Sequence, residues 1–211
     1  DLVKDLEDLS FHEACRLIVE QYNDFVLHNN GGYDVQEFKQ ASRYQVKSYE
    51  FREWNTRDQY YWTQFNIGSR LLEEHCVRPL QSYTLAKDYE GTPYCLTITG
   101  NYLYGYFKQD GTLYKVYQPK TLDKKFIKVN DYIQGSEQLK DHKYLIITSS
   151  LKDIMAIKSL KIPVDVVAPD SENSMIRREV MKEYLEKYQK VIILFDFDEA
   201  GIKSSDKYKE M

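Results

Sequence analysis

The chain has 211 residues, of which 42% are hydrophobic and 29% charged. This composition is that of an ordinary globular protein of about one or two domains and excludes a disordered chain. No run approaches the ~20 apolar residues of a transmembrane helix, and the net charge of -4 argues against a protein that coats nucleic acid over its whole surface. We therefore expect a cytoplasmic protein with no membrane partner.

The three cysteines and the two ends of the chain carry less information. Cys15, Cys76 and Cys95 are widely separated, a spacing that suits neither a disulfide framework nor a zinc site. The chain begins without Met and ends soon after the start of a final helix pattern. We expect it to be part of a longer protein.

The first region, residues 1–53, contains one clear helix pattern. Residues 10–22 place apolar side chains at helical spacing behind Ser10, and Glu13 completes a capping box. Asn-Gly-Gly turn signals and polar residues follow, up to about residue 53. This pattern predicts an amphipathic helix and a linker.

The second region, residues 54–140, predicts two short helices and an antiparallel sheet. Residues 56–76 read as two helices whose aromatic and leucine side chains pack together. Trp62 and Phe65 could form a platform for base stacking, but a place in the core is the favoured interpretation. From residue 80 to about 117 apolar residues alternate with polar ones between turn signals such as "QDG", which indicates a small antiparallel sheet.

The third region, residues 141–211, alternates strands with helices. Buried strands are predicted at residues 143–148, 164–168 and 190–195, with amphipathic helices between them. This alternation indicates parallel strands joined by right-handed crossovers. Ligands of such sheets gather at the carboxyl ends of the strands, where "TSSLKD" and "DFDEAG" stand.

The second of these clusters contains two aspartates, Asp196 and Asp198, directly after a strand. Side chains alternate along a strand, so both carboxylates can project the same way. Carboxylates that lie so close repel each other unless a cation is bound, and Mg²⁺ or Mn²⁺ is the natural partner. In the alternative interpretation Asp198 caps the last helix and Asp196 is solvated. These residues alone do not decide between the two.

A basic segment lies in the second region. Between Lys108 and Lys128 there are six lysines and two aspartates, with Tyr114, Tyr117 and Phe126 among them. Such a segment suits contacts with phosphates. The alternative is an ordinary solvated loop, because lysines are common on surfaces.

The motif Asp196 to Gly201, "DFDEAG", after a strand and a helix with "KD" in its first turn, resembles the Toprim domain of DnaG-like and bacteriophage primases. Upstream, "LSFHEACRLI" is similar to the segment after the zinc-binding domain of these primases, and "YYWTQFNIGSRLLEEHCVRPL" to their basic N-terminal subdomain. The resemblance implies an α+β fold class. An α/β Toprim domain, with a Rossmann-like βαβαβ parallel sheet, would follow a small helical and antiparallel β subdomain.

The resemblance also implies domain boundaries. Residues 1–53 would join a missing zinc-binding domain, residues 54–140 would be the basic N-terminal primase subdomain, and residues 141–211 a Toprim domain without its C-terminal part. "IITSSLKDIMAI" lies where the family has its first acidic motif, so Ser149 stands in place of a glutamate and Ser150 in place of a glycine.

The site residues implied by the resemblance fall into three sets. The metal ligands at the nucleotidyl-transfer centre would be Asp196 and Asp198, and Asp153 would be a further catalytic acid. Ser149, Ser150 and Lys152, at a helix N-terminus, would bind phosphate; in the alternative the site is degenerate and Ser150 with Asp153 is a capping box. The residues that would contact nucleic acid or nucleotide are Lys115, Lys120, Lys124, Lys125, Lys128 and Asn130.

The function implied is that of a DNA primase, a nucleotidyltransferase that uses Mg²⁺ or Mn²⁺ to synthesise primers. Its partners would be a single-stranded DNA template, nucleoside triphosphates and a replicative helicase, fused or separate. A phage-encoded protein would act in the host cytoplasm. Ser149 favours the main alternative, a catalytically degenerate module that binds DNA as a replisome scaffold. A phosphohydrolase fits less well, because Ala200 stands where such enzymes have Thr or Val.

Overall fold

The computed structural model describes residues 45–89, 92–121, 124–171 and 174–210. These residues all belong to one compact unit, which spans residues 43–211. The helix expected at residues 10–22, Cys15 and most of the expected first domain lie outside the described residues.

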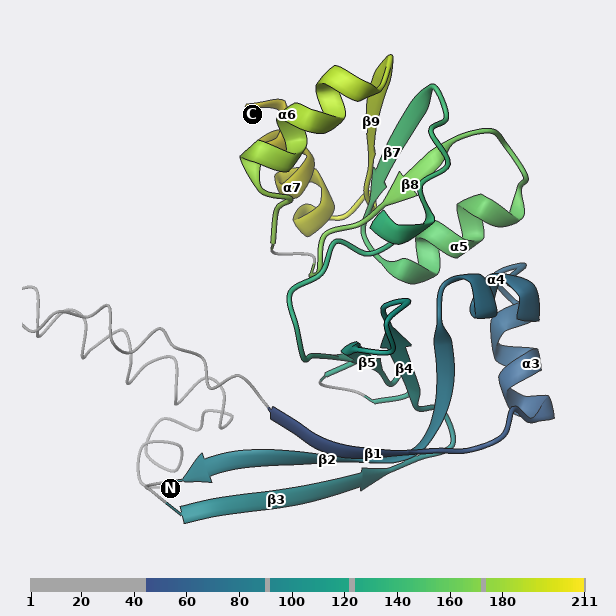
Figure 1. The fold of residues 1–211 in the computed structure, drawn as a ribbon, viewed down its shortest axis with the longest axis vertical. Coiled ribbons are helices and arrows are strands. Elements are labelled where there is room, and N and C mark those ends of the chain that lie inside the picture. Colours follow the sequence, from purple (N-terminus) through teal and green to yellow (C-terminus); the bar gives the residue numbers. More distant parts are fainter. Residues whose placement is uncertain (1–44, 90–91, 122–123, 172–173, 211) are drawn as a thin grey trace, which may run out of the picture. The chain divides into compact units, whose positions relative to one another are not determined.

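The larger of the two sheets is antiparallel, and β2 (Val77–Tyr89) is its central element (Figure 1). One half of β2 pairs with β1 (Gln45–Phe51) and β3 (Thr92–Thr99), while its first residues pair with β4. The strands β4 (Tyr104–Phe107), β5 (Leu113–Tyr117) and β6 (Phe126–Lys128) continue the sheet in that order. The alternation of apolar and polar residues from residue 80 onward therefore does mark antiparallel strands.

A tight turn joins β4 to β5 at the predicted "QDG" signal. Gly111 has a φ of 85° and its N–H donates to the carbonyl of Lys108 at 3.0 Å. The Asp110 carboxylate accepts the N–H of Thr112 at 2.8 Å. A left-handed conformation favours glycine, so the turn has the residue types that its geometry requires.

Two short helices, α3 (Thr56–Thr63) and α4 (Ser69–Glu74), precede β2. Asn55 caps α3 in a capping box with Asp58, whose carboxylate accepts the N–H of Asn55. Trp62 is only 1% exposed and stacks edge-on against Tyr104. The prediction that Trp62 belongs to the core is thus confirmed.

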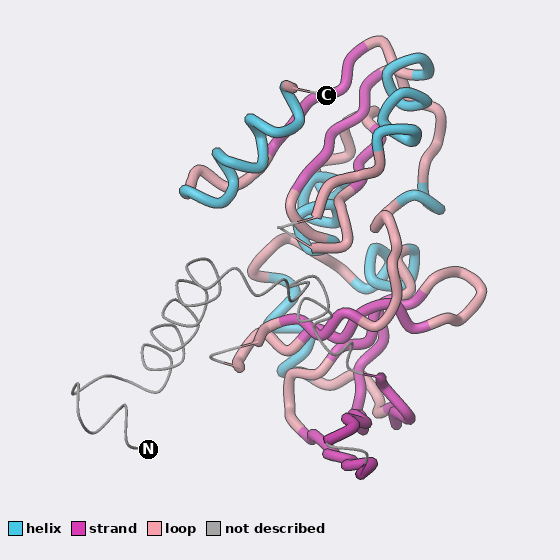
Figure 2. The backbone as a smooth tube through the Cα atoms, turned by 90° about the vertical axis from the view of Figure 1, so that its left-hand side faces the viewer, coloured by secondary structure: helices cyan, strands magenta, loops and turns pink. Residues whose placement is uncertain are grey.

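The second sheet has three parallel strands in the order β8-β7-β9 within the described residues. The strands are β7 (Tyr144–Thr148), β8 (Asp165–Val167) and β9 (Lys190–Leu194). The helix α5 (Leu151–Ser159) follows β7, α6 (Arg178–Lys187) follows β8, and α7 (Glu199–Lys209) follows β9. A short 3-10 helix, η2 (Ser136–Gln138), lies before β7. Figure 2 shows the two sheets in separate parts of the unit.

The expected fold class is contradicted. The principal sheet is antiparallel and curled, and the parallel sheet has only three strands in the described residues, so it is not a Rossmann-like Toprim core. The error has a physical reason. Alternating strand and helix patterns report local structure and crossover connections, whereas the number of strands that join a sheet depends on pairing between distant segments.

Apolar packing links the two sheets. One cluster includes Tyr61 and Trp62 of α3, Tyr104 of β4, and Ile154 and Met155 of α5. A second lies between β7 and the helices α6 and α7, through residues such as Leu145, Tyr184 and Tyr208. The parallel sheet therefore has α5 against one face and α6 with α7 against the other, which leaves the ends of its strands for polar groups.

Candidate functional site

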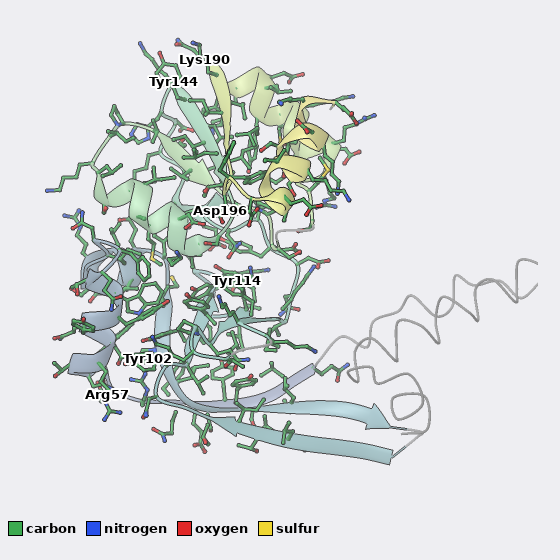
Figure 3. All side chains as sticks on the ribbon, turned by 180° about the vertical axis from the view of Figure 1, so that it is seen from behind. Arg57, Tyr102, Tyr114, Tyr144, Lys190 and Asp196 are labelled. Atoms are coloured by element: carbon green, nitrogen blue, oxygen red, sulfur yellow. The ribbon has the colours of Figure 1, made fainter. Side chains whose placement is uncertain are left out.

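The carboxyl ends of the parallel strands meet at a small acidic pocket. Asp196 lies at this end of the sheet, opposite the end where Tyr144 and Lys190 begin their strands (Figure 3). The pocket has a volume of about 20 Å³. Its lining residues are Ser149, Pro169, Phe195, Asp196, Asp198, Ala200, Gly201 and Ser204. This volume suits one water molecule or one small ion, and a whole nucleotide would have to extend outside it.

Asp198 is the N-cap of α7, as the alternative interpretation of the motif requires. Its Oδ1 accepts the N–H of Gly201 at 2.7 Å. That bond uses one oxygen, and within the described ranges Oδ2 has no hydrogen-bond partner. Asp196 is exposed and precedes the cap by two residues. A capping role and a ligand role are therefore compatible in Asp198.

Gly201 holds the start of α7 against the backbone of Asp196. A Cβ atom at residue 201 would lie 2.0 Å from the carbonyl oxygen of Asp196, far inside any van der Waals contact. No other residue type fits here without displacement of the Asp196 backbone. The glycine of the motif thus has a steric reason that does not depend on any resemblance.

The donor set of the pocket limits the metal that it could hold. Among the described residues no group of three His, Cys, Asp or Glu side chains is placed to hold a metal ion. The acidic pocket is lined by two carboxylates and by the hydroxyl-bearing side chains of Ser149 and Ser204. Mg²⁺ is commonly bound by one or two carboxylates together with water and substrate phosphates. The residues therefore fit Mg²⁺ or Mn²⁺ shared with a phosphate ligand, and do not fit a site made of protein ligands alone.

Asp153 has a different environment from Asp196 and Asp198. It lies in the first turn of α5, where Ser150 is the N-cap. The Ser150 hydroxyl donates to Asp153 Oδ2 at 2.6 Å, and Lys152 Nζ lies 3.6 Å from Asp153 Oδ1. Asp153 does not line the acidic pocket. The structure therefore brings Ser149 together with Asp196 and Asp198, while Ser150, Lys152 and Asp153 form a separate cluster at the N-terminus of α5.

The predicted nucleic-acid-binding residues Lys115 and Lys128 contact other side chains of the protein. Lys115 is 4% exposed, and its Nζ donates to Gln134 Oε1 at 3.2 Å. Lys128 Nζ lies 2.6 Å from Asp131 Oδ1 and 2.5 Å from Asp170 Oδ2. Burial lowers the pKa of Lys128, but its bonds to the two carboxylates outweigh burial and the pKa is raised.

The other four residues predicted to contact nucleic acid are three exposed lysines and an asparagine that bonds to the backbone. Lys120, Lys124 and Lys125 are exposed, and the ammonium of Lys120 lies 5.7 Å from the centre of the Tyr102 ring. Asn130 donates from Nδ2 to the carbonyl of Leu113 at 2.8 Å. Lys120, Lys124 and Lys125 thus present their side chains to solvent, while the Asn130 amide supports the start of β5.

Sequence reasoning missed Pro169 and Ser204 as lining residues of the acidic pocket. Pro169 comes shortly after β8, so its place after a predicted parallel strand was a usable signal. Ser204 lies one turn into α7. Its spacing of three residues from Gly201 places the two on one helix face.

Comparison with solved structures gives a likeness that carries an argument about the fold. No protein-family model and no curated protein matches the sequence. The primase of Aquifex aeolicus, in a crystal structure of its zinc-binding and RNA polymerase domains, is similar with a TM-score of 0.53 and 16% identity. The match covers 98% of this chain and 59% of that one. The fold is primase-like.

A weaker likeness is to a chain in a structure of bacteriophage T7 lagging-strand DNA polymerase interacting with primase domains bound to an RNA/DNA hybrid and dTTP. The TM-score is 0.36 and the identity 16%, over 70% of this chain and 65% of that chain. A score this low carries no argument. No helix in the described ranges has the length and apolar character needed to cross a membrane.

Proposed function

We propose that the chain is part of the catalytic core of a DnaG-like DNA primase of bacteriophage type, which synthesises short primers on a single-stranded DNA template. The observation that supports this most is the meeting of Asp196, Asp198 and Ser149 in one acidic pocket at the strand ends. The primase-like fold is consistent with it. The protein would act on nucleoside triphosphates, with a replicative helicase as a partner.

The proposed chemistry depends on positions and charges. Asp196 and Asp198 would hold Mg²⁺ or Mn²⁺. Asp198 would bind the ion through Oδ2, because its Oδ1 accepts the Gly201 N–H in the α7 cap. The chemistry that such an ion supplies when bound is neutralisation of phosphate charge and activation of the attacking hydroxyl. Ser149 would donate a hydrogen bond to a phosphate oxygen at the same place.

The lysines would orient the rest of the substrate. The exposed Lys120, Lys124 and Lys125 would pair with phosphates of the template or of the incoming nucleotide, a contribution that falls with added salt. Lys152 and the free backbone N–H groups at the start of α5 would face phosphate as well. Lys115 and Lys128, whose charges already have protein partners, would act by fixing the strands that carry them.

A titration of Mn²⁺ tests the acidic pocket, with and without a nucleoside triphosphate. The variant Asp196→Asn with Asp198→Asn keeps a good helix cap, since Asn caps as well as Asp, but removes both charges. We expect its Mn²⁺ affinity to fall at least about tenfold in the presence of nucleotide. Asp206→Asn, which removes an exposed carboxylate further along α7, is the matched control. Ser149→Glu should strengthen binding by adding a third carboxylate.

The second candidate function is a DNA-binding scaffold with a degenerate catalytic site. It is favoured by Ser149 and by the absence, among the described residues, of a three-residue metal cluster. In that case the wild-type chain and the double Asn variant would bind Mn²⁺ equally weakly and single-stranded DNA equally well. Loss of primer synthesis in the double variant would exclude the scaffold.

A further inference from the structure

A basic groove lies at the amino ends of the parallel strands, at the opposite end of the sheet from the acidic pocket. Its volume is about 720 Å³, within the range of small-molecule sites. The side chains that matter here are Asn66, Arg70, Lys140, His142, Lys158 and Lys161. The five residues of β7 separate this end from Ser149 by about 16 Å, at ~3.3 Å per residue. Figure 3 shows the two ends through Tyr144 and Asp196.

The charge of the basic groove is strongly positive. Four cationic side chains line it, and Glu74 is the carboxylate among its described lining residues. Glu74 pairs with Lys140 at 2.8 Å, and Lys158 Nζ lies 3.8 Å from the buried Asp165. Within the described ranges Arg70 and Lys161 have no ion-pair partner. Two cations therefore face the groove without compensation, which favours an anionic ligand.

A buried carboxylate fixes the orientation of His142. Asp165 is fully buried, and its Oδ1 accepts a hydrogen bond from Nδ1 of His142 at 2.9 Å. It also accepts the N–H groups of Lys140 and His142 and, at 2.8 Å, the hydroxyl of Tyr188. Burial raises the pKa of Asp165, but these hydrogen bonds outweigh burial and the pKa is lowered. Among the described residues nothing hydrogen-bonds Nε2 of His142. Because Nδ1 donates its proton to Asp165, Nε2 can donate to a phosphate oxygen in the imidazolium form, in which both ring nitrogens carry a proton.

A hydrogen bond and an ion pair connect the two walls of the groove. Asn66, between α3 and α4, donates from Nδ2 to the Ser159 hydroxyl of α5 at 3.1 Å. The pair of Lys140 and Glu74 joins the segment before β7 to α4. The backbones of Asn66 and Lys161 each have a φ of 57°, a conformation set by the tight chain reversals there. The groove is thus preformed, which reduces the entropy cost of binding.

We propose that the basic groove is a second ligand site, which binds the phosphoryl groups of a nucleotide, either free or as part of a nucleic-acid strand. Four cationic side chains line the groove, and this number suits more than one phosphoryl group, because guanidinium and ammonium groups each pair with phosphate oxygens. Leu71, Ile162 and Pro163 add an apolar wall that suits the rest of a nucleotide. The site does not depend on the acidic pocket or on a metal.

The test uses the whole chain, with EDTA present so that the acidic pocket binds no metal. Calorimetry with inorganic tripolyphosphate, ATP and a single-stranded oligonucleotide compares the wild type with Arg70→Ala plus Lys161→Ala. We expect affinity for tripolyphosphate to fall at least tenfold in this variant. The matched control is Arg178→Ala plus Lys182→Ala on the exposed face of α6, which removes the same charge and should leave binding unchanged.

A second readout locates the ligand. The chain has only four histidines, so tripolyphosphate should shift the imidazole nitrogen resonances of His142 in a ¹⁵N spectrum, and Asp196→Asn plus Asp198→Asn should not abolish that shift. Displacement of tripolyphosphate by ATP alone would assign the site to a free nucleotide, and displacement by the oligonucleotide would assign it to a strand. An equal loss of affinity in the α6 control, or no shift at His142, would overturn the proposal.

Discussion

The centre of the antiparallel sheet and the edge of the parallel sheet differ in how far their side chains are buried. Every residue of β4 and β5 is buried, and the surrounding tyrosines pack ring against ring, as Tyr61 does with Tyr104. In β9 exposed residues alternate with half-buried ones, and Ile192 and Leu194 are 43% and 49% exposed. The part of the antiparallel sheet formed by β4 and β5 is therefore a closed scaffold, although β1 and β3 are mostly exposed. The parallel sheet is open at its β9 edge and carries polar groups at both strand ends.

Charged groups show the same contrast. Asp58 in α3 is fully buried and accepts two bonds from Arg52, at 2.5 and 2.8 Å, and one from the hydroxyl of Tyr104 at 2.8 Å. Asp196 and Asp198, beyond the parallel sheet, are exposed. Carboxylates that bind a ligand must be accessible, whereas those that hold a fold together can be enclosed. The difference in burial thus separates the structural carboxylate of Asp58 from the two accessible carboxylates that we propose as ligands.

The largest expected effect comes from removal of Asp58. Asp58→Ala leaves the Tyr104 hydroxyl buried without its partner. It also removes the carboxylate of the partly buried Arg52 guanidinium, which keeps its bonds to the carbonyls of Glu53 and Asn101, and we expect a loss of about 3 kcal/mol in the free energy of unfolding. Asp206→Ala breaks an exposed pair with Lys209 and should cost below about 1 kcal/mol. Urea denaturation of both variants measures the difference. Equal losses would contradict the closed-scaffold description.

A smaller effect is expected from pH, through His75 at the end of α4. This side chain is 2% exposed and neither ring nitrogen has a hydrogen-bond partner among the described residues. Burial lowers the pKa of His75 from 6.5 to about 4. Below about pH 6.5 His75 is therefore protonated in the unfolded chain, while in the folded chain it stays neutral down to about pH 4. The stability that depends on the neutral ring is complete above pH 6.5 and is lost as the pH falls toward 4.

The measurement is urea denaturation at pH 8 and pH 5 for the wild type and for His75→Leu. The wild type should lose about 2 kcal/mol more than the variant between these pH values. The pKa values of the buried carboxylates Asp58 and Asp165 are also lowered, so their protonation at low pH destabilises the fold. This loss of stability is the same in the wild type and in His75→Leu, and it cancels when the two are compared. If His75→Leu had the same pH dependence as the wild type, the folded and unfolded chains would protonate this ring equally readily, and the prediction would be wrong.

Local parts of the fold were predictable from sequence because they depend on local physics. The period of two from residue 80 onward, the turn at Gly111 and the capping residue Ser150 each correspond to observed structure. The sheet architecture was not, because the six antiparallel and three parallel strands of the described residues are joined by pairings between distant segments. The alternation of strand and helix patterns did predict the parallel pairing of β7 with β8 and β9. The Rossmann-like Toprim sheet, which the resemblance implied, was wrong.

The positions of the candidate site residues were predictable to a similar degree. Strand ends brought Asp196, Asp198 and Ser149 into one pocket, as parallel strands require. The ion pairs of Lys128 with Asp131 and Asp170, and the burial of Lys115, could not be read from a run of lysines. Side-chain partners depend on which segments become neighbours in space, and composition does not carry that information.

The smallest expected effect tests the open edge of the parallel sheet. Ile146 of β7 and Ile192 of β9 are partners in register, but Ile146 is 8% exposed and Ile192 is 43% exposed. Ile192→Thr should change the free energy of unfolding by no more than about 0.5 kcal/mol, whereas Ile146→Thr places a hydroxyl in the core and should cost about 1–3 kcal/mol. Since both strands are parallel and both changes are chemically identical, the difference in cost measures burial alone. A cost at Ile192 as large as that at Ile146 would mean that this face is covered in solution, and the contrast between a closed and an open sheet would then be wrong.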